Sequence, residues 1–196
     1  MYQPLKLAVF LLLAACGGEK ADEAALQNHA REVVQLFFQS CVAHSGDGAS
    51  VGGWAAQNGF AALDAAAVKK LPLGMIELGA QNVWRAEQGG AEYYLTWGRD
   101  GCGMKTPLAD EAAVRSLFAE WAEKGGAGQT VRLRADNYSP SPFPFSQLVY
   151  SWQQGGEAVE TLLSANTSPS KHVPAQAALN YSRAPMTAIP AAVLGQ

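Results

Sequence analysis

Apolar residues between Glu23 and Val42 recur at steps of three and four positions, which is the spacing of one face of an α-helix. The apolar positions of this segment are Leu26, Ala30, Val33, Val34, Phe37 and Cys41. A second segment with the same period carries Val114, Leu117, Phe118 and Trp121. We expect this second helix to begin at Pro107, because proline fits the first turn, and to end at Gly125-Gly126.

Shorter helices are expected between these two. Ser50 is predicted to cap a helix that runs through Trp54 to Asn58, and a further helical segment is predicted from Ala61 to Lys70. The first third of the mature chain is therefore expected to be helical.

After Gly79 the pattern changes to short runs rich in aromatic and β-branched residues. Residues 82–88 and 92–97 flank Gly89-Gly90, which predicts a β-hairpin. Further strands are predicted at residues 102–104, 130–135, 145–153, 158–165 and 175–181. Tight turns between consecutive strands favour antiparallel pairing. The predicted fold class is α+β, with N-terminal helices packed on a mainly antiparallel β-sheet that one helix interrupts.

The first fifteen residues have the layout of a secretory signal, with Lys6, an apolar run from Leu7 to Leu13, and then small residues. This run is too short to cross a bilayer core, which takes about 20 helical residues. Residues 13–16, Leu-Ala-Ala-Cys, resemble the lipobox of bacterial lipoproteins. That resemblance implies cleavage before Cys16 and lipidation of this residue. An ordinary signal peptide followed by an incidental cysteine is the alternative.

The predicted anchor sets the expected location. Acyl chains on Cys16 would hold the protein on a membrane, since each buried methylene contributes about 0.8 kcal/mol. Gly17 stands where lipoproteins of this class carry an aspartate for inner-membrane retention, so we expect the outer membrane. The domain would face either the periplasm or the cell exterior.

Four segments are expected in the chain. Residues 1–15 would be the cleaved signal peptide and 16–22 the lipidated cysteine with a short tether. Residues 23–183 would form a single globular domain, and 184–196 a loosely held tail. The formal net charge is −3 and no basic block exists, which argues against a nucleic-acid partner.

Two cysteines follow Cys16, and they are Cys41 and Cys102. In an oxidising compartment they are expected to form a disulfide, which would stabilise the fold by on the order of 4 kcal/mol. Two free buried thiols are the alternative. A metal site is not expected, because no histidine stands at a ligand spacing from either cysteine.

The sequence predicts no catalytic residue, no metal and no cofactor. It contains neither a His-Glu-x-x-His zinc motif nor a phosphate-binding glycine loop. His29, His44 and His172 are scattered along the chain and are expected to be solvated. An enzyme of unfamiliar design stays an open alternative.

Aromatic residues offer the clearest candidate for a contact surface. The five tryptophans lie on apolar faces of predicted elements, where they are expected in the core. Prolines between Ser139 and Pro144 hold the backbone extended. Tyr138 precedes this loop, Phe143 lies within it and Phe145 follows it. If exposed, these three side chains would contact a partner. Packing over the edge of their own sheet is the alternative.

Several short runs together carry a family resemblance. They are Phe-Phe-Gln-Ser-Cys at 37–41, Trp-Ala-Ala-Gln-Asn-Gly-Phe at 54–60, Trp-Arg at 84–85, Tyr-Leu at 94–95, and Cys102. The chain resembles a small family of proteobacterial lipoproteins and secreted proteins of neisserial type. The resemblance implies export, a pair of bonded cysteines, and no assigned activity.

These expectations favour a non-enzymatic envelope lipoprotein that binds another envelope component. The alternative from a different class is a periplasmic domain that binds or senses a small molecule, in a pocket between the aromatic-rich sheet and its helices.

Overall fold

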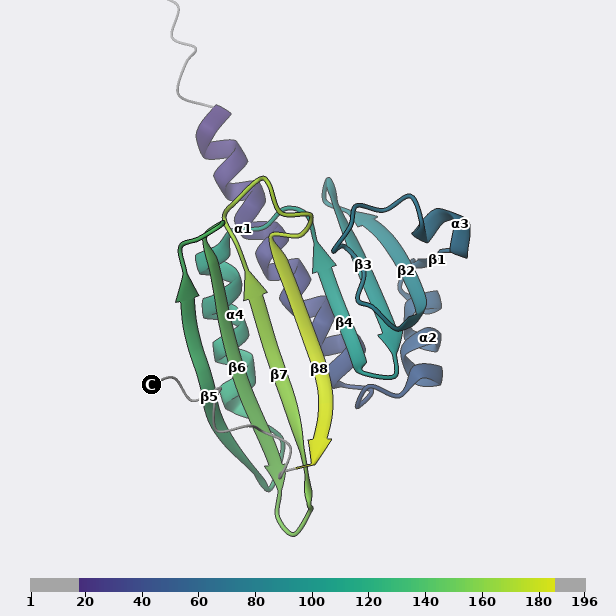
Figure 1. The fold of residues 1–196 in the computed structure, drawn as a ribbon, viewed down its shortest axis with the longest axis vertical. Helices are drawn as coiled ribbons and strands as arrows, with labels where there is room; N and C mark the ends of the chain where they lie inside the picture. The colour runs from purple at the N-terminus through teal and green to yellow at the C-terminus, as the bar shows by residue number, and fades with distance from the viewer. Residues whose placement is uncertain (1–17, 186–196) are drawn as a thin grey trace, which may run out of the picture.

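The computed structural model describes residues 18–185. The predicted signal peptide, the lipidation site at Cys16 and residues 186–196 of the predicted tail lie outside the described residues. The described chain forms one eight-stranded antiparallel sheet with two long helices on one face (Figure 1). The predicted α+β class is confirmed.

The sheet has the strand order β1-β2-β3-β4-β8-β7-β6-β5. Its strands are β1 (Ala61–Ala62), β2 (Ala80–Gln88), β3 (Ala91–Gly98), β4 (Gly101–Thr106), β5 (Gln129–Ser139), β6 (Phe145–Gln154), β7 (Val159–Thr167) and β8 (Ala177–Pro185). Every predicted strand has a counterpart here, and β1 is an addition.

The helices are α1 (Gly18–Phe37), a π-helical continuation η1 (Phe38–Val42), α2 (Gly48–Gln57), α3 (Ala65–Val68) and α4 (Glu111–Lys124). The helix α4 carries the chain from β4 in the middle of the sheet to β5 at its edge. The strands β5 to β8 then return step by step until β8 pairs with β4.

The core lies between the sheet and the pair α1 and α4. Helix α1 contacts β4 and β8, and α4 contacts β5, β6 and β7. The buried stripe predicted for the first helix is confirmed, because Ala30, Val33, Phe37 and Cys41 are all fully buried. Alternate residues of the central strands, such as Leu179, meet this stripe from the sheet.

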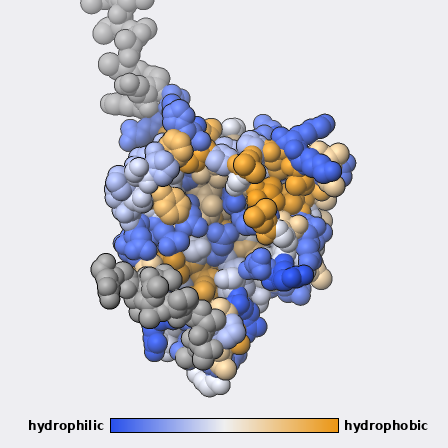
Figure 2. All heavy atoms as spheres, in the orientation of Figure 1, coloured by the Kyte–Doolittle hydropathy of each residue, from blue (hydrophilic) through white to orange (hydrophobic). Residues whose placement is uncertain are grey.

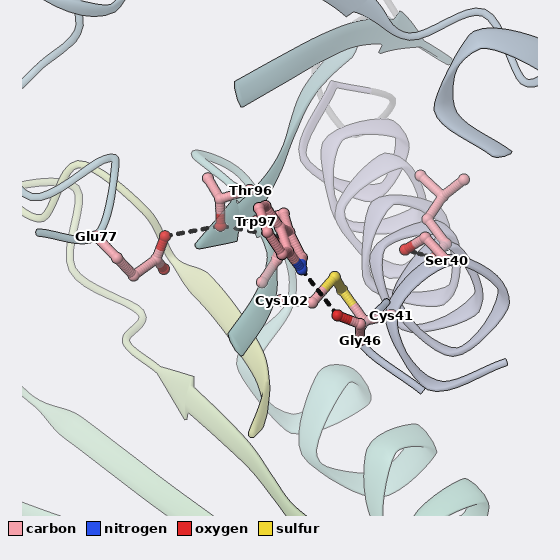
Figure 3. Close-up of a disulfide and its surroundings, with 9 residues drawn as sticks. Ser40, Cys41, Gly46, Glu77, Thr96, Trp97 and Cys102 are labelled. Carbon is pink, nitrogen blue, oxygen red and sulfur yellow. Dashed lines mark hydrogen bonds between the residues drawn. A yellow bond between two sulfur atoms is a disulfide. The ribbon is translucent and has the colours of Figure 1, made fainter. Parts of the chain in front are cut away.

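The disulfide predicted between Cys41 and Cys102 is present, with the Cα atoms 5.4 Å apart. It joins the π-helix to β4, and both cysteines are buried. Figure 3 shows Trp97 on the same side of the sheet as the disulfide, where its indole N–H donates to the Gly46 carbonyl oxygen at 2.8 Å. Thr96 points to the opposite side, as alternation along a strand requires.

Several predicted boundaries are wrong. The helix α1 begins at Gly18, five residues before the predicted helix start at Glu23. At the other end β8 continues through Pro185, past the predicted strand end at residue 181. Regular structure therefore extends further at both ends than the apolar pattern indicated.

Capping explains the errors in helix starts. Asp47 caps α2 by accepting from the backbone N–H of Ser50, the residue that was expected to be the cap. Asp110 caps α4 in the same way, so this helix begins at Glu111, four residues after the predicted start at Pro107. The predicted helical segment 61–70 contains only α3, preceded by the short strand β1.

Candidate functional site

The face of the sheet opposite the helices is crossed by an irregular segment between α3 and β2. We call residues 71–79 the strap. Three hydrogen bonds or ion pairs hold it to the sheet. Lys105 of β4 donates to the Gly74 carbonyl oxygen at 3.1 Å and pairs with the Glu77 carboxylate at 2.9 Å. Thr96 of β3 donates to the other Glu77 oxygen at 2.8 Å. Because Lys105 and Thr96 are both buried, these contacts fix the strap in place.

Two leucines of the strap point into solvent. Met75 is 2 % exposed, whereas Leu73 is 97 % and Leu78 is 96 % exposed. The two leucines stand next to the clamped residues Gly74 and Glu77, so their backbone is held while their side chains are free. Figure 2 views this face and shows hydrophobic atoms gathered over the strap side of the sheet.

A cleft of about 250 Å³ lies beside Leu78. Its floor includes Gly98, Gly101 and Gly103, and the side chains of Thr96, Asn180 and Glu77 surround it. A Cβ at position 103 would lie 2.9 Å from the Asn180 amide oxygen, so a larger residue there would have to displace that side chain. Leu78 lines this cleft, which no motif in the sequence indicated.

A second polar network lies further along the same face. Glu92 accepts hydrogen bonds from Tyr94, at 2.6 Å, and from Arg85. The bond from Tyr94 lowers the pKa of Glu92, and Arg85 adds to this effect. Burial, reinforced by the bond to Glu92, raises the pKa of Tyr94 to about 12. This arrangement favours the ionised form of Glu92 and the protonated form of Tyr94, and its hydrogen bonds stabilise this face of the sheet.

The aromatic residues predicted as a contact loop lie at the end of the sheet where β5 ends and β6 begins. Tyr138 is 65 %, Phe143 is 42 % and Phe145 is 41 % exposed. The ring of Phe143 stacks on His172, with the centroids 5.8 Å apart. Phe143 is therefore partly covered by a neighbouring loop, and the three side chains offer less apolar surface each than the strap leucines.

The histidines do not form a site. His44 and His172 lie at the surface, but the expectation that His29 is solvated is wrong. It is 7 % exposed, and its Nε2 donates to the Gly89 carbonyl oxygen at 3.1 Å, which ties α1 to the β2–β3 hairpin. Among residues 18–185 no group of three or more metal-binding side chains is found.

The letters Gly-x-Ser-x-Gly occur once, at residues 48–52, and the structure shows what they do. A catalytic elbow places its serine on a sharp turn from a strand into a helix, with an imidazole as base. Here the motif forms the first turns of α2, and Ser50 bonds to the capping carboxylate of Asp47. Asp47 is fully exposed to water. The motif is therefore a helix start and provides no activated nucleophile.

None of the described helices is long and apolar enough to cross a membrane. No protein-family model matches the chain, and no curated protein or solved structure matches it either.

Proposed function

We propose that this protein is a lipid-anchored cell-envelope protein whose domain binds another envelope protein without catalysing a reaction. The anchor rests on the lipobox that ends at Cys16. Binding rests on one observation: two leucines of a clamped strap are almost fully exposed on a folded surface.

Exposed apolar side chains on an ordered segment favour a partner for two reasons. Covering a leucine completely contributes about 1.5–3 kcal/mol, so the two leucines together would contribute about 3–6 kcal/mol. The clamp by Lys105 and Thr96 also means that little conformational entropy is lost when a partner binds. A partner with an apolar patch would cover Leu73 and Leu78 and reach into the cleft beside Leu78.

The test is chemical cross-linking in intact cells followed by mass spectrometry. We expect one reproducible protein partner with the native chain, and loss of that partner with Leu73→Ser/Leu78→Ser. Leu133→Ser is the matched control, because Leu133 is also an exposed leucine but lies on the edge strand β5. Cys16→Ala removes the predicted lipid site and tests whether capture needs the anchor. Repeated recovery of no partner would refute the proposal.

A second candidate function is small-molecule binding on the helix-covered face. It is favoured by a pocket on that face, which is described next.

A further inference from the structure

A pocket of about 360 Å³ opens on the helix-covered face, at the end of the sheet where η1 and α4 finish. Its floor is a row of three side chains across β6, β7 and β8, because Trp152 pairs with Thr161 and Thr161 with Arg183. Around this row lie Val42, Ser45, Gln129, Gln154, Glu157, Val159 and Tyr181. The pocket is on the opposite face from the strap and is a separate site.

The lining combines aromatic rings with neutral hydrogen-bonding groups. Trp152 is held in place, since its indole N–H donates to the Ala122 carbonyl oxygen at 2.7 Å. The side chains of Thr161, Gln154 and Tyr181 make no hydrogen bond within the described part of the chain. Hydroxyl and amide groups both donate and accept hydrogen bonds, so these three side chains can act toward a ligand as donors or as acceptors.

The charges of the pocket balance each other. Glu157 and Arg183 are paired at 3.3 Å, and both side chains are about half exposed at the mouth. No other lining side chain carries a charge. A strongly charged ligand would therefore find no unpaired counterion here, whereas an uncharged ligand would meet donors and acceptors on both sides.

The wall of the pocket is built from unusual backbone. Val42 ends a π-helix, a feature that often lies at functional sites. Ser45 has a φ of 51°, and no other non-glycine residue among residues 18–185 has a positive φ. The Cys41–Cys102 disulfide fastens this wall to the sheet, and Cys102 pairs directly with Tyr181. The wall is thus linked to the floor through β4.

We propose that this pocket binds an uncharged, hydroxyl-rich ligand of the saccharide class. A sugar ring has C–H faces that pack on aromatic rings and hydroxyl groups around its rim that bond to amides and hydroxyls. Trp152 is only partly buried and supplies the ring, whereas the buried Tyr181 ring closes the pocket beneath it. Thr161, Gln154 and the Arg183–Glu157 pair supply the polar contacts. The proposal deepens the second candidate function and is independent of the strap.

The test uses the full-length lipidated chain in a non-glycosidic detergent, applied to a glycan array and then titrated by calorimetry with the best neutral oligosaccharide. Thr161→Val keeps the shape of the side chain and removes one hydroxyl, so we expect about tenfold weaker binding. Arg183→Met should weaken binding to a similar degree. Arg132→Met is the matched control, since Arg132 is an exposed arginine on the edge strand β5, and binding should stay within about twofold of the native value.

Two results would overturn the proposal: no glycan bound by the native chain, or binding that Thr161→Val and Arg183→Met leave unchanged. Circular dichroism confirms that each variant is folded before its affinity is compared. Loss of partner capture by the strap variant would not affect this result, because the two sites lie on opposite faces of the sheet.

Discussion

The Cys41–Cys102 disulfide should contribute substantially to the stability of the fold. The perturbation is Cys41→Ala/Cys102→Ala, which avoids leaving one unpaired thiol. The cysteines are 61 residues apart, and closing a loop of this size restricts the unfolded chain by about 4 kcal/mol in the chain-entropy model. For a domain of this size, that loss lowers the midpoint of thermal unfolding by about 8–16 °C.

The assay is urea unfolding of the variant and the native chain under oxidising conditions, followed by circular dichroism. The rate at which dithiothreitol reduces the disulfide is a second readout, because Cys41 is 0 % and Cys102 is 2 % exposed. Dithiothreitol should therefore leave the disulfide intact in the folded chain and reduce it once urea has unfolded the domain. A loss below about 1 kcal/mol, or equal reduction rates with and without urea, would refute the reasoning.

Three further changes test other parts of the structure. Lys105→Met removes the ion pair with Glu77 and the hydrogen bond to Gly74, so we expect a loss of about 1–3 kcal/mol in chemical denaturation and faster proteolysis within the strap. Glu92 has a lowered pKa in the folded state, so its stabilisation is complete above the unfolded pKa of about 4.5 and disappears as the pH falls through the folded pKa. The unfolding midpoint of Glu92→Gln should therefore approach that of the native chain in acid, and parallel pH curves would contradict this. Gly46→Ala places a Cβ 2.8 Å from the Tyr181 ring at a φ of +66° and should destabilise by more than about 1 kcal/mol, whereas Gly53→Ala, in a helix with open space around it, should stabilise by about 0.5–1 kcal/mol in the same unfolding assay.

Local signals in the sequence were sufficient for much of the fold. Gly89-Gly90 marked a hairpin, and the structure pairs Gln88 with Ala91 across it. The period of the first helix identified its buried face, because one face of a helix must meet the core wherever that core lies. The disulfide was predicted from two cysteines after Cys16 and from an expected oxidising compartment, and the structure contains it.

Features that depend on distant residues were not predictable in this way. The strap is held by Lys105, 31 residues after Gly74, and without that contact its leucines look like ordinary core residues. His29 is buried and bonds to the backbone of Gly89, which is 60 residues away. The saccharide pocket depends on the strand register that aligns Trp152, Thr161 and Arg183. Periodicity does not report such pairings, because it describes one element at a time.

The most direct test of partner binding places a photoreactive amino acid at Leu78 in the lipidated chain and irradiates intact cells. The same amino acid at Leu133 is the control, because that leucine is exposed on the far edge of the sheet. We predict that Leu78 yields one discrete cross-linked protein and that Leu133 yields none. The same products from both positions, or none from Leu78, would contradict the claim that the strap is a docking surface.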